Sequence, residues 1–244
     1  MCTVTYIPQS NSNYVLTSNR DESVKRAKAL TPELIKLEDI NVIFPKDSSK
    51  GGTWIGTTDH GKTLCLLNGA FVKHEVTHNY IKSRGLVVLD FFKAKDTKSF
   101  IKSYSLKGIE PFTLVIIDGC EVLSLIELKW DGIEKHISVL NPNKSHIWSS
   151  ATLYNVEQTE FKASVFRDFV KTNPSSTEIL EFHENGTDND SRLMKYINPN
   201  STIETISITQ IITSLNGAEI KHKDLLQHSV SEKQIKIEEE SLLV

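Results

Sequence analysis

Cys2 is the residue whose type and position suggest chemistry most directly, because it follows the initiator Met1. Removal of a methionine before a small residue is common, and it would leave Cys2 with a free α-amine beside its thiol. The α-amine has a pKa of about 8 and the thiol one of about 8.5, so a base and a partly ionised nucleophile would share one residue. An N-terminal threonine works by the same logic. The alternative is that Cys2 simply starts a buried strand.

A polar run, Asn19-Arg20-Asp21-Glu22, directly follows the apolar segment YVLTS. If the strand ending here pairs with the strand that carries Cys2, the hairpin brings Arg20 and Asp21 near the thiol. A guanidinium there would favour the thiolate and bind a carboxylate or carbonyl, while a carboxylate could orient the α-ammonium. The alternative is a solvated turn with a surface ion pair.

Two glycine-containing motifs complete the candidate site. In GGTWIG (51–56), the glycines permit close backbone approach and Trp54 could wall a pocket. At the end of a later apolar run, Asn68 and Gly69 offer an amide side chain and a backbone N–H, the donors that an oxyanion hole requires. The alternatives are a bulge with a core tryptophan and an Asn-Gly turn.

Alternation and helical spacing predict the elements that must position these residues. Strands are expected at 2–7, 14–18, 51–57, 63–67, 112–118, 122–128, 135–140, 202–212, 218–220 and 234–238. Helices are expected at 79–94, 97–104, 157–171 and 177–183. Hairpins, then helices, then strands again predict an α+β domain with mostly antiparallel sheets, and we expect residues 1–244 to form a single domain.

The bulk composition excludes several classes of function. The chain has 244 residues, 39% of them hydrophobic, and a formal net charge of -3, so no bulk charge favours nucleic acid or anionic lipid. We expect no integral membrane association and no signal peptide. The three scattered cysteines favour a reducing compartment, so a cytoplasmic location is expected, and no metal site is predicted. The oligomeric state stays open.

Taken together, Met1-Cys2, SNRDE (18–22), GGTWIG (51–56) and LLN (66–68) resemble the NRDE family, which includes the animal Transport and Golgi organisation protein two. The resemblance is strong over about the first 70 residues and weak in the last third of the chain. It implies the four-layer αββα sandwich of N-terminal-nucleophile hydrolases.

A more distant resemblance to cysteine amidases such as bile salt hydrolase and penicillin V acylase implies roles for individual residues. By that likeness Cys2 is the nucleophile, Arg20 and Asp21 form a pocket pair, and Asn68 contributes to the oxyanion hole. Asn19, Trp54, Gly69 and Ser150 are the expected substrate-binding residues. The segment Ser149-Ser150-Ala151 stands where those amidases use a second asparagine, and residues 202–212 hold no arginine.

Three functions fit these features. The first is a cytosolic hydrolase that cleaves a non-peptide C–N amide bond of a small molecule through a Cys2 acyl-enzyme, without a cofactor. The second, implied by the animal relatives, is binding or trafficking of haem or an acyl lipid, with His74 and His78 at helical i, i+4 spacing and Cys2 or Cys65 as candidate ligands. The third is a degenerate hydrolase fold that acts as a scaffold.

Overall fold

The computed structural model describes residues 3–75, 77, 79–120, 122–186, 194–196 and 201–237. Its strands are β1 (Thr3–Pro8), β2 (Tyr14–Ser23), β3 (Leu30–Leu37), β4 (Ile40–Lys46), β5 (Ile55–Thr58), β6 (Lys62–Asn68), β7 (Phe112–Asp118), β8 (Ser124–Trp130), β9 (Lys135–Leu140), β10 (His146–Ser149), β11 (Ile203–Ser214), β12 (Gly217–Asp224) and β13 (Ser229–Lys236). The α-helices are α1 (Arg84–Phe92), α2 (Thr97–Ser103), α3 (Val156–Phe169) and α4 (Ser176–Asn185), with short 3₁₀ turns at Ser10–Ser12 and Val170–Thr172.

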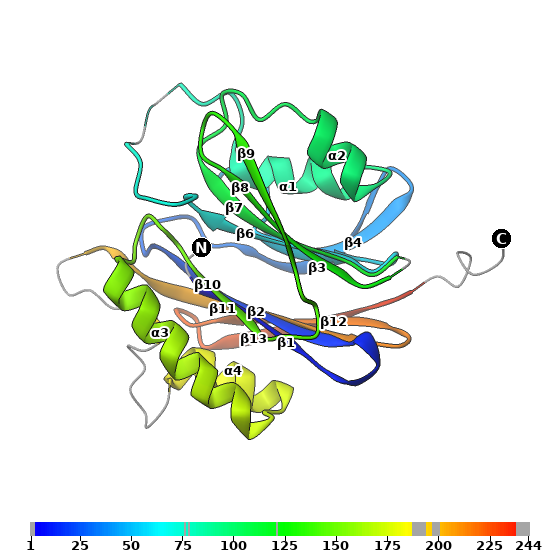
Figure 1. Ribbon diagram of the computed structural model, residues 1–244, viewed down its shortest axis with the longest axis vertical. Coiled ribbons are helices and arrows are strands. Elements are labelled where there is room, and N and C mark those ends of the chain that lie inside the picture. The colour runs from blue at the N-terminus through cyan, green and yellow to red at the C-terminus, as the bar shows by residue number, and fades with distance from the viewer. Residues whose placement is uncertain are drawn as a thin grey trace.

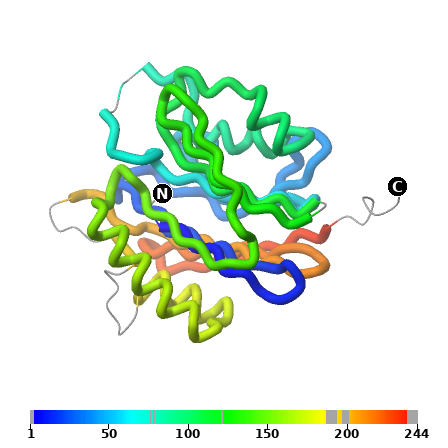
Figure 2. Tube along the Cα trace, in the orientation of Figure 1, coloured from blue at the N-terminus to red at the C-terminus, as the bar shows by residue number. Residues whose placement is uncertain are grey.

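The strands form two antiparallel sheets. The first has six strands in the order β10-β1-β2-β11-β12-β13, and the second has seven in the order β3-β4-β5-β6-β7-β8-β9. In the first sheet β2 pairs with β11, so the N-terminal hairpin and the C-terminal strands lie side by side (Figure 2). The two ends of the chain therefore build one sheet.

The sheets stack face to face and helices cover both outer faces (Figure 1). Helices α1 and α2 lie on the seven-stranded sheet, and α3 and α4 lie on the six-stranded sheet. Both α3 and α4 begin with a capping box, Asn155 with Gln158 and Ser175 with Glu178. The α+β prediction is thus confirmed in its four-layer αββα form. None of the described helices has the length and apolar character to cross a membrane.

Alternation along the N-terminal hairpin separates two environments. Val4 and Leu16 belong to the large core shared by the two sheets, whereas Ile7 and Val15 pack with the helices on the outer face. Because side chains alternate along a strand, the even-numbered positions of β2, including Arg20, face the other sheet.

Two sequence predictions about the elements near the site are wrong. The strand predicted at 14–18 ends too early, because β2 continues to Ser23 and Asn19–Glu22 pair with β11. The segment Gly51–Trp54 is not part of a strand, since β5 begins at Ile55. Strands β3 and β4 were not predicted from the sequence, and the first helix was predicted from residue 79, although α1 starts at Arg84.

Candidate functional site

A polar cavity of about 210 Å³ lies at one end of the space between the sheets. Strand β2 and the segment after it, the segment between β4 and β5, the end of β6, the start of α1 and the segment before β7 all contribute to its wall. The lining residues are Arg20, Glu22, Arg26, Asp47, Lys50, Gly52, Thr53, Trp54, Leu66, Asn68, Ser83, Arg84, Gly85 and Glu110. Four of these carry positive and three carry negative charge, so the cavity is suited to a polar or anionic ligand.

Arg20 forms one wall of this cavity. Its side chain projects from the inner face of β2 and the residue is only 3% exposed. Its guanidinium lies 4.6 Å from the centroid of the Trp54 ring, and its Nη2 donates a hydrogen bond of 2.8 Å to Asp47 Oδ2. Arg20 is thus fixed by a stacking contact and an ion pair.

Asp47 forms ion pairs with two arginines, Arg20 and Arg26. Arg26 Nε donates to Asp47 Oδ2 at 2.9 Å, and Arg26 also lies 3.5 Å from Glu22 Oε2. Burial alone would raise the pKa of Asp47, but the hydrogen bond from Arg26, the Lys50 N–H and the charge of Arg20 lower it below 3.8. Burial lowers the pKa of Arg20 below its usual range against the opposing charge of Asp47, and an arginine keeps its proton at neutral pH.

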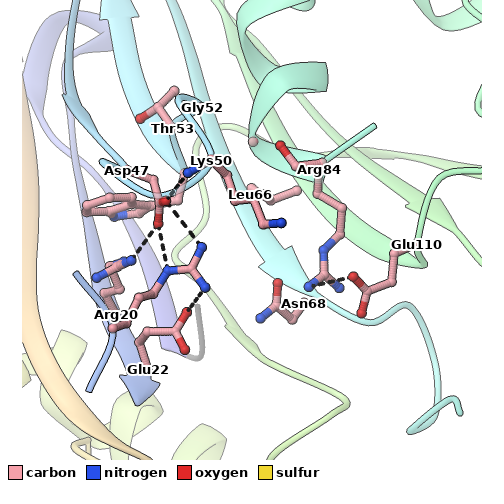
Figure 3. A pocket seen from close by; sticks show the side chains of 14 residues that line it. Arg20, Glu22, Asp47, Lys50, Gly52, Thr53, Leu66, Asn68, Arg84 and Glu110 are labelled. Carbon is pink, nitrogen blue, oxygen red and sulfur yellow. Dashed lines mark hydrogen bonds and ion pairs between the residues drawn. The ribbon is translucent and has the colours of Figure 1, made fainter. Parts of the chain in front are cut away.

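The opposite wall carries a second ion pair. Arg84 Nη2 lies 3.2 Å from Glu110 Oε2, and Arg84 Nη1 donates to the Pro111 carbonyl at 3.1 Å. Figure 3 shows this pair across the cavity from Arg20 and Asp47, with Asn68 between the two. An amide side chain therefore stands between two charged walls.

Gly52 and Gly85 close the back of the cavity. A Cβ on Gly52 would overlap the backbone of Gly85, and the Thr53 N–H donates to the Gly85 carbonyl at 3.2 Å. The glycine pair therefore lets the start of α1 lie directly against the chain before β5, as the GGTWIG motif indicates.

Several buried donors at the cavity lack a hydrogen-bond partner within the described part of the chain. They are Arg20 Nη1, Trp54 Nε1 and Ser83 Oγ. An unpartnered buried polar group costs about 1–3 kcal/mol, and a charged one costs more. Such a cost at a cavity wall is typical of a site prepared for a ligand.

The structure brings together Arg20, Trp54 and Asn68 of the predicted site residues. Asp21 points to the other face of β2, as expected for the next residue of a strand. Its carboxylate accepts hydrogen bonds from Tyr154 Oη at 2.9 Å and Thr205 Oγ1 at 2.5 Å. Asp21 does not line the cavity, and the ion-pair partner of Arg20 there is Asp47.

Asn19 lies on the same helix-facing side as Asp21. It is fully buried, donates to the carbonyls of His183 and Met194, and its Oδ1 lies 2.8 Å from His183 Nδ1. These bonds tie β2 to α4, and the side chain does not reach the cavity.

Gly69 and Ser150 stabilise the backbone at Asn68. Gly69 has a φ of 80°, which favours glycine, and its N–H donates to the Pro111 carbonyl at 3.1 Å. Ser150 Oγ donates to the Asn68 carbonyl at 2.8 Å. Both residues fix the backbone at Asn68, and neither lines the cavity.

Cys2 lies outside the described residues. Its chain neighbour Thr3 is described, and it pairs with Asn19 of β2 and Ser149 of β10. Thr3 Oγ1 accepts a hydrogen bond of 3.1 Å from the buried Lys162 Nζ of α3. Thr3, the first described residue of β1, is therefore fixed by a neighbouring strand on each side and by a hydrogen bond from α3.

Sequence reasoning missed Asp47, Arg84 and Glu110. All three stand in connecting segments or at a helix start, and their partners are far away in the sequence. Only Arg84 carried a signal, because it follows Ser83 at a plausible helix N-terminus.

The haem alternative can be tested against its two described candidate ligands. Cys65 is fully buried and its burial raises the pKa of its thiol to about 12. His74 lies outside any helix and its Nε2 is 3.1 Å from Glu110 Oε1. The predicted helical spacing of His74 and His78 is therefore not present at His74, and burial disfavours a Cys65 thiolate ligand, while Cys2 and His78 lie outside the described residues.

Comparison with known proteins agrees with this fold. An N-acylethanolamine-hydrolyzing acid amidase ortholog from Caenorhabditis elegans superposes with a TM-score of 0.59 at 9% identity, over 86% of this chain and 92% of that one. A variant of conjugated bile acid hydrolase from Clostridium perfringens gives a TM-score of 0.52 at 8% identity, over 95% of this chain and 92% of that one. These likenesses show the N-terminal-nucleophile hydrolase fold.

The family of this chain is identified from its sequence. No curated protein matches the chain. A family profile, that of Transport and Golgi organisation 2, matches residues 1–233. The match covers nearly the whole chain, as the NRDE resemblance predicts. This chain is therefore a member of the Transport and Golgi organisation 2 family.

Proposed function

We propose that this protein is a cytosolic amidohydrolase that cleaves a non-peptide C–N amide bond of a small molecule through an acyl-enzyme on Cys2. The observation that carries the proposal is the buried guanidinium of Arg20, with one nitrogen unpartnered within the described chain, at a polar cavity between the sheets. The fold it shares with an amidase and a bile acid hydrolase supports the same reaction class.

The strand register supports the role of Cys2. The last described pair of the β1–β2 ladder is Thr3 with Asn19; Cys2 precedes Thr3 in the sequence, and Arg20 follows Asn19 on β2. Because consecutive Cα atoms are about 3.8 Å apart, Cys2 starts close to this end of the ladder.

The reaction would proceed by acyl transfer. The Cys2 thiolate attacks the amide carbon, and Asn68 stabilises the oxyanion. The α-amine of Cys2 takes the thiol proton and, as an α-ammonium, gives a proton to the leaving amine, and water then hydrolyses the thioester. Arg20 binds a carbonyl or carboxylate of the substrate.

Two thiols elsewhere in the chain fit the cytosolic part of the proposal. Cys65 and Cys120 are both free, and Cys120 is exposed. An exposed free thiol is typical of a reducing compartment.

The test is turnover of a panel of N-acyl amino acids and acyl amides by protein whose intact mass shows loss of Met1. We expect Cys2→Ala to lower kcat/KM by more than about 10³-fold, because the substitution removes the nucleophile. Cys120→Ser is the matched control, since it removes an exposed thiol and should leave turnover unchanged. Equal turnover by Cys2→Ala and the unaltered chain would contradict the proposal, and so would absence of turnover in every protein.

A further inference from the structure

A second cavity, of about 190 Å³, lies beside the first, between the segment that follows β2 and strands β11 and β12. Its polar lining residues are Arg20, Arg26, Lys28, Ser207, His222, Asp224 and Gln227. Arg20 and Arg26 line both cavities, so their guanidinium groups lie at the boundary between the two.

Three cationic side chains, Arg20, Arg26 and Lys28, line this second cavity. Arg20 and Arg26 are paired with Asp47 of the first cavity, and Asp224 lies 3.7 Å from Lys28 Nζ. His222 adds no charge at neutral pH, because burial lowers its pKa to about 4. Cationic donors at a cavity wall favour an anionic occupant.

Two donors at this cavity lack a hydrogen-bond partner within the described residues. They are Arg20 Nη1 and Ser207 Oγ, on residues that are 3% and 4% exposed. Ser207 pairs directly with Arg20 in the β2–β11 register, so both side chains stand on the same face of the sheet. Two adjacent strands thus present neighbouring unpartnered donors at one cavity.

We propose that this second cavity binds an oxyanion, either a carboxylate or a phosphate group, through Arg20, Ser207 and Lys28. A guanidinium, a hydroxyl and an ammonium together are the donors that such groups accept. The proposal goes beyond hydrolysis and does not depend on it, because binding is measured without turnover.

The experiment is calorimetric titration of the full chain with inorganic phosphate and, separately, with acetate. We expect saturable binding of one of the two, which identifies the ligand as a phosphate or a carboxylate. Lys28→Gln should weaken that binding by about tenfold, since one charge-assisted contact is lost. Ser207→Ala should weaken it by about threefold or more, since a neutral donor is lost.

Two controls separate this cavity from the first. Lys50→Gln removes a cation that lines only the first cavity, so it should leave binding unchanged. Cys2→Ala should also bind normally, which keeps a failure of hydrolysis distinct from a failure of this proposal. Lys28 has an exposed side chain, so its substitution should not disturb folding. Absence of saturable binding, or equal weakening by Lys50→Gln, would overturn the proposal.

Discussion

At the scale of single residues, Arg20 decides the character of the cavity. It is a buried cation whose described ion-pair partner is Asp47, with the Trp54 ring below its guanidinium. Transfer of a charge out of water is unfavourable, so the partner is needed to keep Arg20 in place. Asp47, which sequence reasoning missed, is therefore as important to the site as the NRDE motif.

Asp47→Asn tests this dependence. We expect the free energy of unfolding to fall by about 2–4 kcal/mol, because the substitution leaves Arg20 buried without its counter-ion. Urea denaturation at neutral pH measures the change. The control is Asp168→Asn, which removes an exposed ion pair with Lys171 and should leave stability unchanged. Similar stability of the two variants would argue against a structural role for the Arg20–Asp47 pair.

The same carboxylate should make stability depend on acid. Its pKa is lower in the folded protein than in the unfolded chain, so the folded state binds fewer protons. The stabilisation is fully present above the unfolded pKa of about 4 and is lost as the pH falls further, through the folded pKa. The Asp47→Asn variant should lose less stability over that window than the unaltered protein.

At the scale of elements, the sequence predicted strands best where turns punctuate them. The bounds of β7 and β9 were predicted correctly, because apolar runs end there at Asp118-Gly119 and follow Asp131-Gly132. β3 was missed because it is an edge strand that contains Pro32 and exposes Leu30 and Leu34.

The site was predicted only in part, for a related reason. Short motifs marked Arg20, Trp54 and Asn68, which share the cavity. No local pattern shows that Asp47 meets Arg20 or that Glu110 meets Arg84, since these contacts depend on how separate elements pack. The predicted strand stopped before the polar run at Asn19–Glu22, because the burial of that run comes from α4 and β11, which are distant in the sequence.

The contact between Gly52 and α1 gives a prediction at this scale. A methyl group on Gly52 would meet the Gly85 backbone, which cannot move without shifting the start of α1. We expect Gly52→Ala to lower the free energy of unfolding by about 1–3 kcal/mol. Gly119→Ala is the control, because a Cβ there finds no atom closer than 3.4 Å. Equal urea midpoints for the two variants would contradict the packing role of Gly52.

At the scale of the whole molecule, buried histidines join the layers. His183 of α4 lies 2.7 Å from Thr5 Oγ1 and 2.8 Å from Asn19 Oδ1, so it links the helix layer to the N-terminal hairpin. His222 of β12 stands between the sheets, with its ring centroid 6.0 Å from that of Trp54. Burial lowers the pKa of His183 from 6.5 to about 3 and that of His222 to about 4.

These two histidines should make the folded protein sensitive to mild acid. Between pH 6.5 and about 4 the unfolded chain binds protons that the folded protein excludes, so stability falls with pH by up to about 1.4 kcal/mol per unit for each histidine. Urea denaturation at about pH 7 and about pH 5 measures the slope. His183→Asn should be less stable at neutral pH. It should also show a shallower slope, because of the two histidines only His222 then takes up a proton in the unfolded chain that the folded protein excludes. His228→Asn alters an exposed histidine and should keep the full slope. If His183→Asn also kept the full slope, the exclusion of a proton from His183 could not be a cause of the pH dependence of stability.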